Sequence, residues 1–133
     1  MQPHTLIQSI AWRIAARQNC ARMNNPEWFA RHTEQLDKLA GELPPVTRID
    51  LDASTTNRIV LLTEYHHMND GGYYDGWTTH RVIVQPDLLS GFNVTITGRD
   101  RNDIKDYLAD VFRTALAEVS PQEYQPTGTP VDA

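Results

Sequence analysis

The chain has few of the features that mark a secreted or membrane protein. It contains one cysteine, Cys20, so no intrachain disulfide can form, and this favours a reducing compartment. Its longest unbroken apolar run, Ile59–Leu62, is far too short for a transmembrane helix. The opening residues Met1–His4 lack the basic start and apolar run of a secretory signal. We therefore expect a cytoplasmic protein that does not bind a membrane.

Positive charge is also scarce. The 133 residues include 12 lysines and arginines against 17 aspartates and glutamates, for a net charge of -5. Phosphate backbones repel such a chain unless a local basic patch overrides the total. The best patch, Arg99–Lys105, is interrupted by aspartates. We expect no nucleic-acid partner.

The excess of carboxylates raises a different hypothesis, in which the chain inhibits a nucleic-acid-binding protein by mimicking nucleic acid. That function needs carboxylates that converge on one face. The candidate carboxylates are Asp50, Asp52, Asp100, Asp103, Asp106 and Asp110.

Recognisable catalytic and cofactor signatures are missing. The chain has no nucleophile elbow, no phosphate-binding loop and no dinucleotide fingerprint. Cys20 has no accompanying histidine and asparagine pattern, so it is expected to be an inert thiol. These absences favour a non-enzymatic protein without a cofactor.

The apolar spacing predicts three helices. Thr5 can cap a helix over about Leu6–Asn19, and Asn25 can cap a second helix that starts at Pro26 and ends near Ala40. The strongest helical stripe predicts a third helix that is capped by Asp100 or Asn102 and reaches about Val119. Trp12, Trp28 and His32 are expected to pack in the core or between the first two helices.

Between the helices the apolar period changes from about 3.6 residues to 2, which indicates strands. Four strands are predicted, over Val46–Asp52, Arg58–His67, Thr78–Gln85 and Phe92–Thr97. Short connections favour an antiparallel meander. The expected fold is α+β, with a four-stranded antiparallel sheet and with the two N-terminal helices and the C-terminal helix packed on one face.

The expected domain covers residues 1–119. Residues 120–133 carry Pro121, Pro126 and Pro130 among polar residues. Such a composition buries too little surface to offset its ordering entropy, so we expect a mobile tail.

The richest chemistry lies between the second and third predicted strands. The segment Tyr65–His80 contains three of the five histidines and three of the five tyrosines, together with Trp77, two aspartates and three glycines. Its predicted loop, Asn69–Trp77, is longer than a tight hairpin turn. Three interpretations of this segment remain open.

The first interpretation is a metal site, and with it a metal-dependent hydrolase or a metal-binding protein. His66, Asp70, Asp75 and His80 carry suitable donor atoms, and His66 and His80 could lie close together on paired strands. Neighbouring strand residues face opposite ways, however, so His66 and His67 cannot share one ion in a regular strand. The spacing matches no established zinc motif, and the order of a calcium loop is also missing.

The second interpretation is a recognition surface. Tyrosine and tryptophan offer large contact area at small entropic cost, and glycine lets a loop adapt to a partner. Tyr73, Tyr74 and Trp77 would anchor the partner, with Asp70 and Asp75 setting the polarity. In the third interpretation the same aromatic residues simply close one end of the core.

Three segments resemble a family of small uncharacterised proteins of bacteriophages and prophages. They are Met1–Trp12, His66–Trp77 and Gly98–Leu108, and the similarity extends from Met1 to about Leu116. The resemblance implies a viral or mobile-element origin and expression in a bacterial cytoplasm. It supplies no activity, cofactor or functional residue.

Together these observations predict a phage or prophage accessory protein that binds a host or phage protein through residues 69–77. An exposed sheet face or an open edge strand could also support a homodimer.

Overall fold

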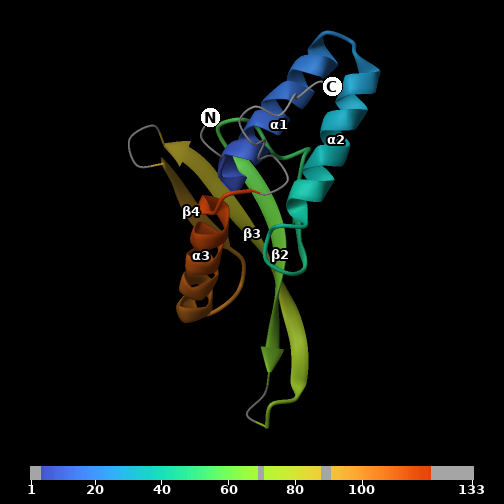
Figure 1. The fold of residues 1–133 in the computed structure, drawn as a ribbon. Coiled ribbons are helices and arrows are strands. Elements are labelled where there is room, and N and C mark those ends of the chain that lie inside the picture. The colour runs from blue at the N-terminus through green and yellow to red at the C-terminus, as the bar shows by residue number, and fades with distance from the viewer. Residues whose placement is uncertain (1–3, 69–70, 88–90, 121–133) are drawn as a thin grey trace.

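The computed structural model describes residues 4–68, 71–87 and 91–120 (Figure 1). The elements follow the order α1 (Leu6–Arg22), α2 (Pro26–Ala40), β1 (Thr47–Ile49), β2 (Ile59–Met68), β3 (Tyr74–Asp87), β4 (Gly91–Thr97) and α3 (Asn102–Ala117). All strand pairs are antiparallel and the sheet order is β1-β2-β3-β4. The predicted α+β class, element order and meander are therefore confirmed.

Local capping explains where the first two helices begin. The Thr5 side chain accepts a hydrogen bond from the Gln8 backbone N–H, and the Gln8 side chain accepts one from the Thr5 N–H. Asn25 caps α2 through the Trp28 N–H, and Pro26 occupies the first helical position. These contacts satisfy backbone donors that have no partner within a helix.

The core lies between one face of the sheet and the three helices. Ile10 from α1, Leu36 from α2 and Phe112 from α3 are buried in one cluster with Leu61 and Val82 of the sheet. Alternate residues on the opposite face, among them Arg81, Asn93 and Thr95, are exposed. The two-layer arrangement predicted from the strand period is therefore present.

Of the two positions predicted for Trp12 and Trp28, the core and the contact between the first two helices, the structure supports only the second. Trp12 and Trp28 are 52% and 47% exposed, although both rings lie about 6 Å from the buried His32 ring, at 5.8 and 5.9 Å between centroids. The α1–α2 hairpin extends beyond the sheet (Figure 1). No third layer among the described residues therefore covers these tryptophans, which lie at the margin of the contact between the helices.

Several predicted boundaries differ from the structure. The first predicted strand, Val46–Asp52, is reduced to Thr47–Ile49: Val46 adopts a left-handed backbone, with φ 59°, and a turn begins at Leu51. Ser120, which composition assigns to the tail, is buried, and its N–H donates to the His4 carbonyl. The remaining tail lies outside the described residues. No helix in the described part of the chain combines the length and apolarity needed to cross a membrane.

Candidate binding arm

The two central strands extend beyond both of their neighbours. β1 pairs with β2 only from Leu61 to Thr63, and β4 pairs with β3 only from Arg81 onward. On the side toward the turn that joins them, residues 64–68 of β2 and 74–80 of β3 form a two-stranded ribbon that projects from the body (Figure 1). We call this ribbon, with its turn, the arm.

The arm corrects the predicted loop. Residues 74–77 belong to β3 instead of a loop, and Trp77 lies opposite His66 in the strand register. Gly76 interrupts the apolar pattern and adopts a positive φ of 91°, so this part of the strand resembles a turn when only local sequence is considered. Cross-strand pairing with β2, which local sequence does not reveal, makes it a strand.

Several large apolar side chains are exposed on the arm. Tyr73 is 74% exposed, Met68 60% and Trp77 58%, and Asp75 is also exposed. The Trp77 ring lies 6.4 Å from the His66 ring, measured between centroids. Of the other predicted contact residues, Asp70 and the Tyr74 side chain lie outside the described part of the structure.

The opposite face of the arm packs toward α3. The Tyr65 ring contacts the edge of the His67 ring at 4.9 Å and the Tyr107 ring of α3 at 6.3 Å between centroids. The His67 Nε2 lies 2.6 Å from the Thr78 Oγ1, which joins the two strands of the arm. These contacts orient the base of the arm against the body.

A largely buried histidine–aspartate cluster holds the base of the arm to the segment before α3. The His80 Nε2 lies 3.1 Å from the Asp100 Oδ2, and the His67 Nε2 lies 3.4 Å from the same oxygen. The His80 Nδ1 donates to the Thr97 carbonyl at 3.0 Å, since a carbonyl only accepts. The Nε2 can then donate to Asp100 only when the ring is the imidazolium cation.

The environment of Asp100 sets its charge. Its side chain is 8% exposed. Burial raises the pKa of the Asp100 carboxyl, but hydrogen bonds from His80 and the Arg101 backbone, with the charges of His67 and His80, outweigh burial and lower it below the ordinary value. Asp100 is therefore an anionic partner for the two histidines near neutral pH.

Close packing at this cluster requires a glycine. Gly98 ends β4 with φ 134°, a conformation that side chains disfavour. A Cβ at this position would lie 2.5 Å from the His80 Nδ1 and 3.2 Å from the Thr79 carbonyl oxygen. The absence of a side chain at Gly98 leaves the room that the His80 ring occupies beside the turn that carries Asp100.

The predicted metal ligands do not converge. His66 pairs with Trp77, whereas His80 pairs with Thr63, so the two histidines occupy opposite faces of the ribbon. The expectation that His66 and His80 lie close together is therefore wrong, and it is His67 that approaches His80. Within residues 4–68, 71–87 and 91–120, no group of three or more histidine, cysteine or acidic side chains is arranged to hold a metal ion.

Asp100 and His67 are the residues that sequence reasoning missed. Asp100 or Asn102 is predicted to cap the last helix, but the N-cap is Arg101, which makes no side-chain capping bond, and Asn102 is the first helical residue. Strand alternation could have placed His67 and His80 on one face once the register was known. No sequence pattern links Asp100 to them.

Comparison with protein-family models, curated proteins and solved structures gives no significant match.

Proposed function

We propose that this chain is a non-enzymatic protein-binding module whose arm supplies the main contact residues. The observation that carries the proposal is the exposure of Tyr73, Trp77 and Met68 together on a ribbon that projects from the body. Aromatic side chains and methionine are enriched at protein interfaces. Aromatic rings bring large contact area with few rotatable bonds, and the flexible methionine side chain adapts to irregular surfaces. Large apolar side chains grouped on a projecting element mark an interaction site more often than single scattered ones.

The buried cluster supports this function by holding the base of the arm. An isolated two-stranded ribbon is marginally stable in water. The His67 and His80 contacts with Asp100 tie both strands to the α3 side of the molecule. A fixed base lowers the ordering cost of binding, which improves affinity without adding contacts.

The proposed partner is a protein of the bacterial host or of the phage, in line with the resemblance of the sequence to phage and prophage proteins. The rival function, mimicry of nucleic acid, has less support. Of its candidate carboxylates, Asp100 is buried, and Asp103 and Asp110 form ion pairs with Arg101 and Arg113.

The test is affinity capture from a lysogenic bacterial lysate, followed by calorimetry with the purified partner. The double substitution Tyr73→Ala and Trp77→Ala should abolish binding while the circular dichroism spectrum and unfolding midpoint stay unchanged. Trp12→Ala is the matched control, since Trp12 is also about half exposed but lies on α1. If the double variant binds as tightly as the wild type, or if the Trp12 variant loses binding, the arm is not the main contact surface.

A further inference from the structure

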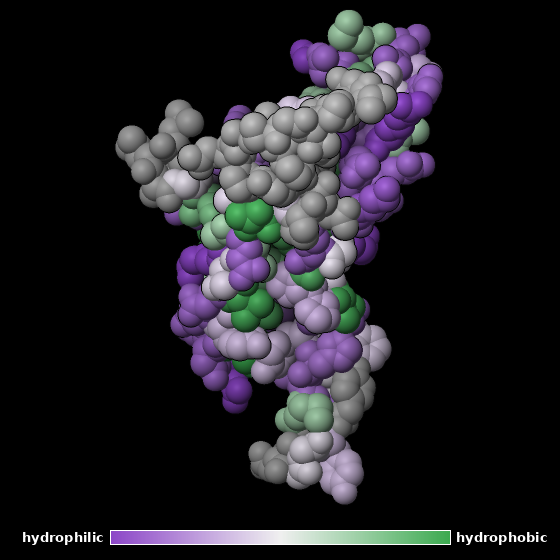
Figure 2. Space-filling model, in the orientation of Figure 1, coloured by the Kyte–Doolittle hydropathy of each residue, from purple (hydrophilic) through white to green (hydrophobic). Residues whose placement is uncertain are grey.

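The base of the arm has a second feature, which is independent of the exposed aromatic residues at its tip. A hollow of about 370 Å³ lies beside β2, between this strand and α3. Its walls include Tyr65 of β2 and the apolar side chains of Tyr107, Leu108, Val111 and Phe112 from α3. Figure 2 shows hydrophobic surface in the middle of this face of the molecule. We call this the helix-side hollow.

The helix-side hollow adjoins a strand edge that β1 does not cover. The last pair between the two strands joins Thr47 to Thr63. The Val60 carbonyl accepts from the Asp50 N–H, so the Val60 backbone points toward the β1 side. Backbone groups alternate along a strand, and those of Leu62 and Glu64 therefore point the same way. At Glu64, β1 has already ended.

The local sequence prevents β1 from covering this edge. Pro44 and Pro45 have no N–H to donate to a sheet ladder. Val46 follows with φ 59°, a left-handed conformation that is rare for a β-branched residue. These three residues line the helix-side hollow instead of continuing the strand. The sequence before β1 thus leaves the edge of β2 beyond Thr63 without a neighbouring strand among the described residues.

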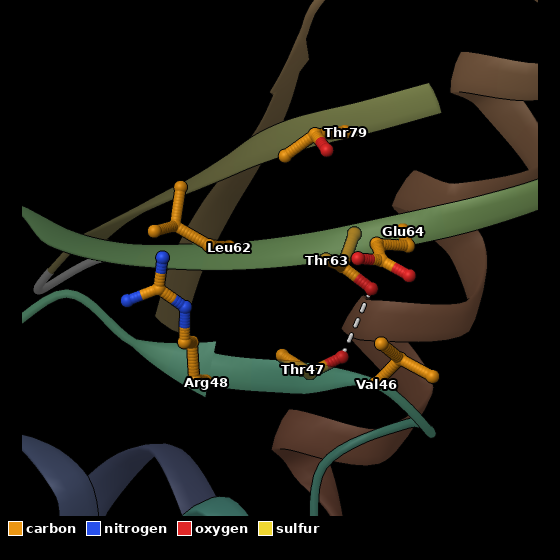
Figure 3. Close-up of a pocket in the computed structure, with 7 residues that line it drawn as sticks. All are labelled: Val46, Thr47, Arg48, Leu62, Thr63, Glu64 and Thr79. Atoms are coloured by element: carbon orange, nitrogen blue, oxygen red, sulfur yellow. Dashed lines mark hydrogen bonds between the residues drawn. The ribbon is translucent and has the colours of Figure 1, made fainter. Parts of the chain in front are cut away.

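A second hollow, of about 340 Å³, opens near the same edge, and we call it the open-face hollow. Figure 3 shows Leu62 of β2 and Thr79 of β3 among its lining residues. The two hollows share Val46, Thr63 and Glu64. Successive side chains of a strand point to opposite faces of a sheet. A strand added at Glu64 would therefore place alternate side chains in the two hollows.

The charges around the helix-side hollow favour a basic partner. A shallow surface along α3 shares Tyr107 and Val111 with this hollow. Three carboxylates line the hollow and this surface, which together we call the groove: Glu64 in the hollow, and Asp110 and Glu118 on the surface. The described residues that line the groove include no lysine or arginine. Arg113 pairs with Asp110 at 2.7 Å and the His66 ring lies 3.2 Å from Glu64, so the surface remains net acidic after both contacts are counted. Complementary charge on a partner steers binding and selects the register.

We propose that this edge binds an extended segment of a partner protein as an added β-strand. In the bound segment, one apolar side chain fills the helix-side hollow, and the polar side chains on either side of it point toward the open-face hollow. Lysine or arginine at the flanks of the segment faces the carboxylates. Backbone hydrogen bonds to the edge supply affinity, and the hollows supply selectivity. This site is separate from the arm's exposed aromatic residues, so it can be tested separately from the proposed function.

The test begins with selection of short random peptides, displayed as a library, against the full chain. The enriched peptides should alternate apolar and polar residues and carry lysine or arginine at the flanks. Fluorescence anisotropy with the best peptide then compares variants. Val111→Asp and Asp110→Lys should each weaken binding by about tenfold or more. Asp37→Lys, the matched charge reversal on an exposed position of α2, should bind like the wild type.

A second measurement reports the binding mode. Hydrogen exchange at the Glu64 amide should slow when the peptide is bound, since strand addition gives that N–H a carbonyl partner. Trp77→Ala should leave peptide binding unchanged, and this separates the edge from the arm's aromatic residues. Enrichment of no peptide or of acidic peptides, binding unaffected by both groove variants, or unchanged exchange at Glu64 would overturn the proposal. So would protection of Glu64 in a peptide-free dimer detected by sedimentation, because a second copy would then occupy the edge.

Discussion

The His80 Nε2 lies 3.1 Å from the Asp100 Oδ2, and this contact joins the third strand to the turn before the last helix. The His80 side chain is fully buried and the Asp100 side chain nearly so. The second ring nitrogen of His80 donates to the Thr97 carbonyl, so both ring nitrogens have a hydrogen-bond partner. His80 and Asp100 therefore form a buried pair in which the carboxylate is the hydrogen-bond partner of the ring nitrogen.

Removal of Asp100 should strongly destabilise the fold. Asp100→Ala leaves the His80 ring buried without its anionic partner, and loss of one member of a buried pair costs about 3 kcal/mol or more. Urea denaturation measures the change in the free energy of unfolding. Asp110→Ala is the control: the Asp110 carboxylate pairs with Arg113 on the surface of α3, and its loss should cost less than about 1 kcal/mol. Similar unfolding midpoints for the wild type and the Asp100 variant would mean that the contact contributes no stability.

The same carboxylate predicts a pH dependence in acid. The pKa of Asp100 is lower in the folded state than its ordinary value of 3.8. Its ionised form therefore stabilises the fold above that value, and the contribution is lost as the pH falls through the lowered folded pKa. The difference in unfolding free energy between the wild type and Asp100→Asn should be larger at about pH 5 than at about pH 2. A difference that stays constant or grows in acid would contradict the assigned direction.

The elements that local patterns specify were predictable. The capping residues Thr5 and Asn25 mark the starts of the first two helices, and alternation places His80, Val82 and Val84 on the buried face of β3. Each of these signals depends on residues within a few positions of one another. The burial of one helix face or one strand face follows directly from such spacing.

The site was less predictable because it depends on contacts between distant segments. The sequence favours His66 as the partner of His80, whereas the register and alternation bring His67 to that position. Asp100, 20 positions from His80, resembles a helix cap when only its neighbours are considered. The strand character of residues 74–77 likewise depends on pairing with β2. Local sequence describes none of these three relationships.

Two buried serines should respond oppositely to substitution by alanine. The Ser9 Oγ is buried without a hydrogen-bond partner among the described residues, so Ser9→Ala should raise the free energy of unfolding by about 1 kcal/mol. The Ser54 Oγ instead accepts from the Val60 N–H and donates to the Asp50 carbonyl, and Ser54→Ala should lower it by about 1–3 kcal/mol. Chemical denaturation of the two variants in parallel checks the contrast. Destabilisation by Ser9→Ala would show that its hydroxyl has a partner.

Gly98→Ala should be more damaging than alanine at another glycine with positive φ. The new Cβ would lie 2.5 Å from the His80 Nδ1, and we expect overpacking and backbone strain to cost about 3 kcal/mol together. Gly76→Ala is the control, since φ is 91° there and no described atom lies within 4 Å of the added Cβ. Strain by itself should cost about 1–2 kcal/mol at that position.

A double variant separates the clash with His80 from the backbone strain. In Gly98→Ala combined with His80→Ala the ring that meets the new Cβ is absent, so the double variant should lose less stability than the sum of the two single losses. The strain from the positive φ and the approach to the Thr79 carbonyl at 3.2 Å remain in both backgrounds and cancel in the comparison. Denaturant unfolding of all four proteins gives the coupling energy. Strict additivity would show that the side chain of His80 does not determine the need for glycine at this position.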